Sequence, residues 1–192
     1  MGLTGGIAAG KSEALAALER LGAAVLSADA VVHDLYSDPG LRGAVVERWG
    51  AGVAPGGIVD RKAVAARVFG DEPERAWLER LVWPRVGQAI AAWHAERERQ
   101  DPPPSAVVVE VPLLFEAGMD VLFDATIAVV ADDGVRRRRA AVDGLAAFDE
   151  RAARQLTQAD KAGRADHVVV NDGSLETLER SLAEVLVKLK GR

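Results

Sequence analysis

The sequence lacks cysteine, is poor in aromatic residues and contains no long uninterrupted apolar run. Without cysteine, the 192-residue chain cannot form a disulfide or a thiolate metal site. No apolar run reaches the roughly 20 residues that a membrane-spanning helix needs, and no signal peptide precedes the first motif. These absences lead us to expect a cytoplasmic protein that does not act at a membrane.

Positive charge is also too scarce for a general nucleic-acid binder. Lys and Arg together number 24 against 29 Asp and Glu, which gives a formal net charge of -5. A negative chain is repelled by a phosphate backbone unless a local groove concentrates its cations, so we expect no nucleic-acid partner. Hydrophobic residues make up 49% of the chain and glycines number 19, which favours a single α/β domain packed by small aliphatic side chains.

The segment with the clearest functional motif lies near the beginning of the sequence. Residues 5–12 match G-x-x-x-x-G-K-[ST], the phosphate-binding P-loop. Its glycines let successive backbone N–H groups turn toward phosphate oxygens. Lys11 would add a charge for the β- and γ-phosphates, and Ser12 would offer a hard oxygen ligand to Mg²⁺. The predicted nucleotide-binding residues of this segment are Gly5, Gly6, Ile7, Ala8, Ala9, Gly10, Lys11, Ser12 and Glu13.

Five apolar runs predict the strands of a parallel sheet, at residues 1–4, 23–26, 106–111, 125–130 and 166–170. The later runs are rich in Val, as is typical of strands buried on both faces. Because helical patterns separate the runs, the chain predicts a P-loop NTPase fold of the α/β class, with a doubly wound five-stranded parallel sheet. We expect one domain whose core comprises residues 1–37, 105–131 and 165–192, with a helical acceptor-side insertion at 38–104 and a helical lid at 132–164.

The insertion and the lid carry most of the predicted helices. Within the insertion, the pattern predicts helices over 61–69, 74–81 and 84–99, and most of its tryptophans would serve helix packing. The lid contains four consecutive arginines, Arg136–Arg139, which form either a solvated face or a group that closes on ATP. At most two of them can face one ligand. A second lid helix is predicted over 148–158, and Ser174 is the expected N-cap of the last helix.

Two acidic residues follow predicted strands and have more than one interpretation. Asp29 comes after the second strand, at the sheet edge where ligands bind in open α/β folds, which suggests a catalytic role. It would equally suit the N-cap of a helix over 30–36. Glu110 ends the third strand and would either act on a metal-bound water or be structural.

Several runs together resemble the dephospho-CoA kinase family over nearly the whole chain. They are Leu3-Thr4-Gly5-Gly6-Ile7 with Gly10-Lys11-Ser12, then Ala28-Asp29, Asp60-Arg61, Val68-Phe69, Leu78-Glu79, Pro84, Val111-Pro112-Leu113-Leu114-Phe115-Glu116, Gln155 with Lys161, Ala165-Asp166 and Asn171-Asp172-Gly173-Ser174. The resemblance implies a nucleoside-monophosphate-kinase-like core. It also implies that ATP, with Mg²⁺, phosphorylates the ribose 3′-hydroxyl of dephospho-CoA to give CoA and ADP, the last step of CoA synthesis.

The resemblance also implies roles for individual residues. Asp29 would be the base that deprotonates the 3′-hydroxyl, Lys11 would bind the transferring phosphate, and Arg138 would be the lid arginine that reaches it. Asn171 would lie near the adenine of ATP. The acceptor would contact Asp29, Arg61, Pro112 and Leu113. We expect a monomer or a weak homo-oligomer.

Four positions depart from the family pattern and keep alternatives open. They are Glu13, Ser27, Trp83 and Val142. One alternative is another small-molecule or nucleotide kinase on the same fold, and the other is a nucleotide-binding homologue with reduced catalysis. A GTPase switch is disfavoured, because the chain has no N-K-x-D run for guanine.

Overall fold

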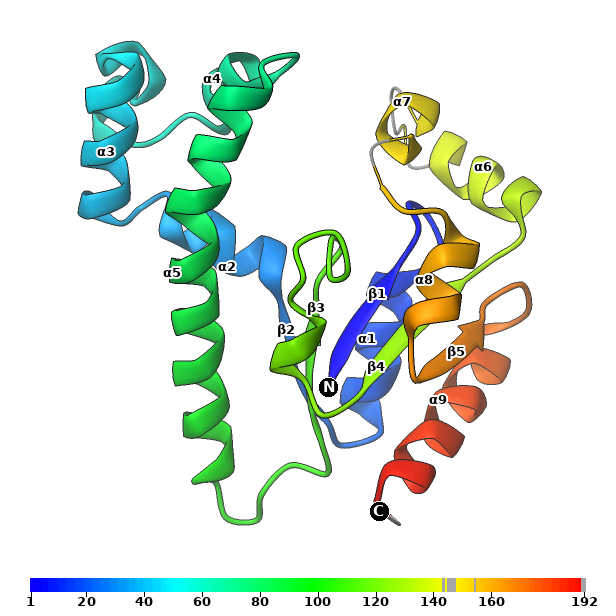
Figure 1. Ribbon diagram of the computed structural model, residues 1–192. Coiled ribbons are helices and arrows are strands. Elements are labelled where there is room, and N and C mark those ends of the chain that lie inside the picture. Colours follow the sequence, from blue (N-terminus) through cyan, green and yellow to red (C-terminus); the bar gives the residue numbers. More distant parts are fainter. Residues whose placement is uncertain (143, 145–147, 154, 191–192) are drawn as a thin grey trace. The chain divides into compact units, whose positions relative to one another are not determined.

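The computed structural model describes residues 1–142, 144, 148–153 and 155–190 (Figure 1). The chain divides into two compact units. The first unit combines Met1–Ser27 with Arg97–Arg192, and the second unit is Ala28–Glu96. Each unit has its own packing and is described by itself below.

The first unit is built on a five-stranded, entirely parallel sheet. The strand order is β2-β3-β1-β4-β5, so the strand that leads into the P-loop lies in the middle. This arrangement confirms the predicted five-stranded α/β fold of the P-loop kinase type. The strands are β1 (Gly2–Gly5), β2 (Ala24–Ser27), β3 (Val107–Glu110), β4 (Thr126–Val130) and β5 (His167–Val170).

Helices cover both faces of this sheet, as the doubly wound prediction requires. On the face to which Leu3 points, helices α1 (Lys11–Arg20) and α9 (Leu175–Lys190) bury Leu18 and Leu182 against the strands. Thr4 points to the opposite face, because side chains alternate along a strand. There α8 (Gln158–Arg164) contacts β1 and β4. The predicted cap of α9 is confirmed, since the Thr177 amide donates to Ser174 Oγ at 3.3 Å.

The segment between β4 and β5 contains α6 (Asp133–Val142) and α7 (Phe148–Ala152) before α8. The predicted single helix over 148–158 is therefore wrong. A new helix begins because Thr157 is an N-cap: its hydroxyl accepts from the Asp160 amide at 3.1 Å within a capping box. The same hydroxyl hydrogen-bonds the Asp160 carboxylate and lowers the pKa of that carboxyl. Arg154, inside the predicted helix, lies outside the described residues.

The second unit is helical. Its small core contains Val45, Val53 and Val64, and Trp49 packs edge-on against Trp77 with ring centroids 5.0 Å apart. The N-caps Asp38 and Asp60 begin two of its helices. Its elements are α2 (Ala28–Leu35), α3 (Pro39–Trp49), two short 3-10 turns (Ala51–Val53 and Pro55–Gly57), α4 (Arg61–Val68) and α5 (Glu72–Glu98).

Two predictions about the second unit are wrong. Residues 74–81 and 84–99 belong to one continuous helix, α5, which runs through Pro84. Pro84 lacks the amide that would bond the Arg80 carbonyl one turn earlier, and the next carbonyl, that of Leu81, accepts from the Arg85 guanidinium at 2.6 Å. Asp29 is not an N-cap, because α2 already begins at Ala28 and places Asp29 in its first turn. Within the described part of the chain, no helix is both long and apolar enough to cross a membrane.

Candidate active site

The loop between β1 and α1 has a backbone that only glycine permits at its two ends. A Cβ atom on Gly5 would clash with the Val129 carbonyl oxygen on the neighbouring strand. Gly10 has a φ of +91°, and a Cβ there would collide with the side-chain nitrogen of Asn171. Because neither neighbour is the free end of a flexible chain, the spacing of the motif glycines is a geometric requirement.

Lys11 lies at the first position of α1, and its ammonium group turns back over the loop. Its Nζ donates to the carbonyl oxygens of Gly5 and Gly6, each at 3.2 Å. Ser12 and Glu13 follow in the first helical turn and are exposed. A cation held over a glycine-rich turn at a helix N-terminus is an arrangement that attracts phosphate.

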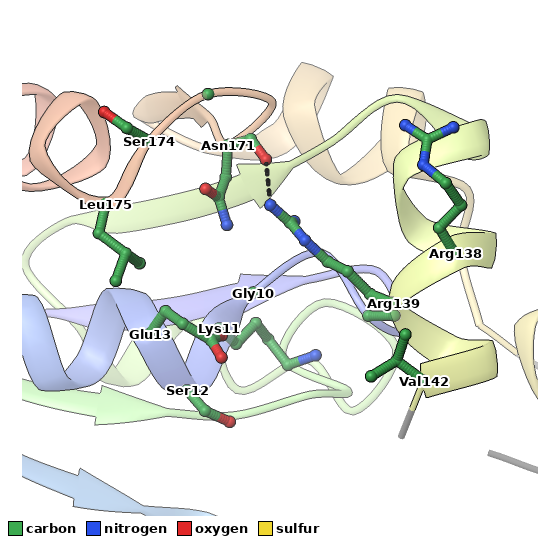
Figure 2. Close-up of a pocket in the computed structure, with 12 residues that line it drawn as sticks. Gly10, Lys11, Ser12, Glu13, Arg138, Arg139, Val142, Asn171, Ser174 and Leu175 are labelled. Carbon is green, nitrogen blue, oxygen red and sulfur yellow. Dashed lines mark hydrogen bonds between the residues drawn. The ribbon is translucent and has the colours of Figure 1, made fainter. Parts of the chain in front are cut away.

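A hollow of about 770 Å³ opens beside this loop (Figure 2). It brings together the predicted residues of the loop, of the arginine run and of the end of β5. The side chains of Lys11 and Arg139 and the residues Glu13 and Val142 stand around it in Figure 2. The lining residues are Ala8, Gly10, Lys11, Ser12, Glu13, Arg138, Arg139, Val142, Asn171, Gly173, Ser174 and Leu175.

Asn171 lines the hollow, yet its side chain is committed to the loop. The residue is buried, and its Nδ2 donates to the Ala9 carbonyl at 2.9 Å. Its own amide donates to the Val130 carbonyl at 2.8 Å, which extends the pairing of β4 and β5. Asn171 therefore holds the P-loop backbone from the far end of the chain, a role that the sequence did not indicate.

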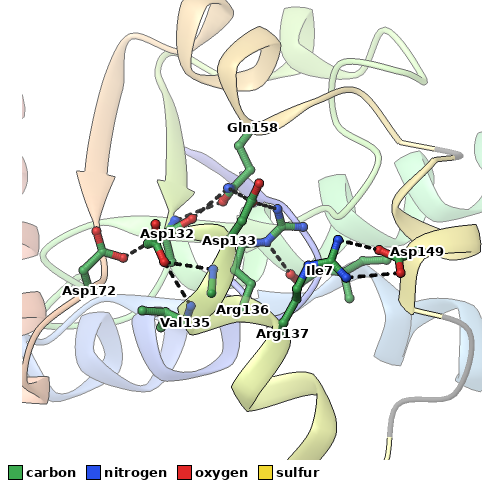
Figure 3. Close-up of polar contacts among 11 residues, drawn as sticks. Ile7, Asp132, Asp133, Val135, Arg136, Arg137, Asp149, Gln158 and Asp172 are labelled. Carbon is green, nitrogen blue, oxygen red and sulfur yellow. Dashed lines mark hydrogen bonds and ion pairs between the residues drawn. The ribbon is translucent and has the colours of Figure 1, made fainter.

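Two of the four consecutive arginines also hold the loop. Arg136 is buried, and its Nε donates to the Ile7 carbonyl at 2.9 Å while Nη1 pairs with Asp133 at 2.8 Å (Figure 3). Arg139 donates to the Asn171 carbonyl at 3.0 Å and to the Ala9 carbonyl at 3.5 Å. Their spacing of three residues places them on one side of α6. The three-residue spacing in the sequence is a signal that could have paired Arg136 with Arg139.

The other two arginines point elsewhere. Arg138 is exposed and lines the hollow, which leaves its guanidinium available to a ligand. Arg137 pairs with Asp149 on the outer surface at 2.9 Å (Figure 3). The arginine run is thus divided between two side chains that hold the loop and two that are exposed, and the Arg138 guanidinium points away from Lys11 in Figure 2.

The start of α6 is fixed by polar contacts to the strand ends. Asp132 Oδ1 accepts from the Gly134 amide at 2.8 Å, and the Asp132 amide donates to Asp172 at 2.6 Å. Gln158 accepts from the Ala131 amide at 2.9 Å and donates to its carbonyl at 2.8 Å (Figure 3). These contacts set the direction in which the helix, and therefore Arg138, leaves the sheet edge.

At the end of β3 the chain places further predicted residues. Ser27 Oγ donates to Glu110 Oε2 at 3.0 Å, as their opposed positions in the β2–β3 register allow. The Pro112 carbonyl accepts from the Thr4 hydroxyl at 3.2 Å, and Leu113 beside it is 38% exposed. Among the described residues, no group of three or more His, Cys, Asp or Glu is placed to hold a metal ion. The exposed Ser12 hydroxyl suits Mg²⁺, which takes most of its ligands from water and substrate phosphates.

The remaining predicted residues belong to the second unit. Asp29 is exposed in the first turn of α2. Arg61 is exposed at the first position of α4, directly after the capping residue Asp60. Both present charged groups to solvent within their own unit.

The segment from the P-loop to the end of β5 can be compared with a known protein family. The family model described as dephospho-CoA kinase matches residues 1–177. The chain belongs to the dephospho-CoA kinase family. A dephospho-CoA kinase of Anaeromyxobacter dehalogenans is 40% identical over 197 residues, covering 100% of this chain and 92% of the relative. One from Symbiobacterium thermophilum is 41% identical, covering 92% of this chain and 75% of the relative.

Solved structures agree with this family at the level of the fold. The crystal structure of TT1252 from Thermus thermophilus has a TM-score of 0.81 and 34% identity, covering 98% of this chain and 96% of that chain. A dephospho-CoA kinase from Campylobacter jejuni has a TM-score of 0.62 at 20% identity, with 98% and 95% covered, which shows a shared fold. The predicted family resemblance is therefore confirmed.

Proposed function

We propose that this protein transfers the γ-phosphoryl group of ATP to the ribose 3′-hydroxyl of dephospho-CoA and releases CoA and ADP. The observation that carries the proposal is the hollow beside the P-loop, which gathers Lys11, Ser12 and Arg138 in a member of the dephospho-CoA kinase family. Such a hollow supplies backbone N–H groups and fixed cations where a triphosphate needs them. The protein is expected to work in the cytoplasm as a monomer or weak homo-oligomer.

Three of the predicted residues of the hollow take part in the transfer. Lys11 exchanges its contacts with the Gly5 and Gly6 carbonyls for the β- and γ-phosphates. Ser12 holds Mg²⁺, which neutralises charge on the phosphate oxygens. Arg138 reaches the transferring group from the wall of the hollow. Since a loose phosphoryl transition state spreads charge over its equatorial oxygens, these cations stabilise it more than the ground state.

The acceptor side is assigned to the helical insertion and to the loop after β3. The Asp29 carboxylate takes the proton of the 3′-hydroxyl as the new O–P bond forms and the bond to the β–γ bridging oxygen breaks. Arg61 and the Pro112–Leu113 segment bind dephospho-CoA. The exposed carboxylate of Asp29 and the exposed guanidinium of Arg61 support these roles, since both are accessible to a ligand. The lid over 132–164 closes on ATP and excludes water.

The deciding experiment incubates the purified protein with ATP and Mg²⁺, with and without dephospho-CoA, and follows CoA and ADP by mass. We expect CoA and ADP in equal amounts, only when dephospho-CoA is present, and much less of both with Lys11→Ala. A panel of other hydroxyl acceptors runs in parallel. Turnover with one of them instead would identify a different small-molecule kinase, and ATP binding without any turnover would identify a homologue with reduced catalysis.

A further inference from the structure

Lys161 is a lysine with no exposed surface, on a helix that the phosphate site does not include. Its relative exposure is 0%, on the side of α8 that faces the sheet. Burial lowers the pKa of Lys161, and the Glu116 carboxylate opposes that shift. An ammonium group is costly to bury, so its oxygen partners have to replace the lost water.

Four oxygen atoms surround the Lys161 ammonium group. Both carboxylate oxygens of Glu116 lie close to Nζ, at 2.9 and 3.2 Å. The Pro112 carbonyl accepts at 2.6 Å, and the Thr4 hydroxyl oxygen lies at 3.4 Å. Thr4 in turn donates to the same Pro112 carbonyl at 3.2 Å, which closes a triangle of polar contacts.

The partners of Lys161 are the ends of the two loops that carry the proposed reaction. Thr4, which is fully buried, directly precedes Gly5, the first residue of the P-loop. Pro112 and Glu116 enclose Leu113, on the segment assigned to the acceptor. Glu116 also accepts from the Leu156 amide at 2.9 Å, just before the cap of α8. One cation therefore connects the donor loop, the acceptor segment and the end of the lid.

We propose that Lys161 is a positioning residue that fixes the Pro112–Glu116 segment against the base of the P-loop and so sets the alignment of acceptor and ATP. This inference rests on the proposed kinase function. Lys161 touches neither substrate and acts through the backbone that it holds. Phosphoryl transfer depends on in-line placement, and a displacement of about 1 Å can slow an aligned reaction by about 100-fold. ATP binding depends on the P-loop amides and Lys11, so it should depend little on Lys161.

The test compares Lys161→Met and Thr4→Val with Arg164→Met, an exposed position on the same helix. Urea unfolding first establishes that each variant is folded. Lys161→Met should lower kcat for CoA formation by about 10- to 100-fold while the KM for ATP stays within about threefold. Thr4→Val keeps the side-chain volume and the Lys161–Glu116 pair, and it should lower kcat by about three- to tenfold. Arg164→Met should match the wild type.

Hydrogen exchange gives a readout that does not depend on activity. The segment after Pro112 is closed by bonds from the Ala117 amide to the Leu113 carbonyl and from the Met119 amide to the Leu114 carbonyl, both at 2.9 Å. These amides should exchange faster in Lys161→Met, while those of β5 and α9 stay unchanged. Should Lys161→Met fail to fold, Thr4→Val carries both measurements.

The outcomes separate the two proposals. A folded variant with wild-type kcat and wild-type exchange would overturn the positioning role. An equal loss of ATP affinity and kcat, together with faster exchange throughout the sheet, would also overturn it. That pattern would mean that the substitution destabilises the whole fold. If the wild type forms no CoA, the proposed function fails, and the exchange comparison alone then decides whether Lys161 holds the segment.

Discussion

Two ion pairs, one in each unit, use similar groups in different surroundings. In the first unit, Lys161 is 0% exposed and Glu116 18% exposed, and the pair also contacts the Thr4 hydroxyl, the Pro112 carbonyl and the Leu156 amide. In the second unit, Arg48 is 43% exposed and Glu74 23% exposed. That pair lies on aromatic packing: Trp49 donates to Glu74 at 2.7 Å and the Arg48 guanidinium lies 5.3 Å from the Trp77 ring centre.

This difference in burial shows that charged side chains serve different purposes in the two units. The first unit has a large apolar core between its sheet and two helices, so its buried cations are not required to close the fold. Lys161 and Arg136, which are buried, hold carbonyls of segments without regular structure, and the half-buried Arg139 does the same. The second unit has a small core, and its ion pair braces one helix against another. We therefore expect charge removal to reduce catalysis in the first unit and stability in the second.

The strongest test of this comparison is Lys11→Ala. Removing the cation aimed at the transferring phosphate should lower CoA formation by about 10²- to 10³-fold. The unfolding midpoint in urea should stay near that of the wild type, because the Lys11 ammonium group donates to the loop carbonyls of Gly5 and Gly6 and Lys11 is not part of the apolar core. Lys188→Ala, an exposed position on α9, is the matched control. An unchanged rate would contradict the P-loop assignment.

Asp29→Asn asks whether the second unit takes part in the chemistry at all. As the proposed base, Asp29 should contribute about 100-fold to kcat, whereas ATP affinity should stay nearly intact. The substitution keeps size and shape at an exposed site, so the helix should be unaffected. Turnover and ATP titration, measured on the same preparation, test whether Asp29 is the base. Parallel losses of binding and rate would argue against a base.

Arg138→Ala, compared with Arg137→Ala, tests which arginine of the run acts on the transferring phosphate. Loss of one charge-assisted contact to the transferring group should lower kcat by about tenfold. Arg137→Ala removes a neighbouring arginine whose partner, Asp149, lies on the outer surface. Steady-state rates for the two variants should differ clearly. If Arg137→Ala were the slower enzyme, the assignment of the ligand-facing arginine would be wrong.

Glu74→Gln should have the smallest effect on catalysis and a measurable effect on stability. Hydrogen bonds from Arg48 and then Trp49 lower the pKa of the Glu74 carboxyl in the folded protein. Its stabilising contribution is therefore present above its ordinary pKa of 4.5 and is lost as the pH falls through the lower folded value. Urea unfolding should show the variant less stable than the wild type at pH 7, with the difference shrinking below about pH 4. A difference that grows toward acid pH would contradict this pairing.

The sequence predicted the sheet well because its signals are local. Runs such as Val107–Val109 and Thr126–Val130 are apolar and β-branched, and the P-loop motif fixes which strand leads into the site. Two helix boundaries were predicted wrongly. The helix α5 continues through Pro84, and the break before α8 depends on the capping box at Thr157.

The residues that organise the candidate site were harder to predict than those that form it. Lys11 and Ser12 are specified by a contiguous motif. Lys161 stands in a polar stretch that is typical of a solvated helix, and only its tertiary partners, 45 and 49 positions away, show that it is buried. Asn171 contacts Ala9 across 162 positions. No pattern within one segment contains such distant contacts.

The bond between Asn171 and Ala9 also has a consequence for the order of events during synthesis. The phosphate loop is made well before β5, whereas the side-chain amide that holds its Ala9 carbonyl belongs to Asn171, directly after β5. β1 likewise waits for both of its sheet neighbours, β3 and β4. The loop cannot take this form on a nascent chain that stops before residue 171. The capacity to hold a nucleotide therefore arises only after β5 and Asn171 have been synthesised.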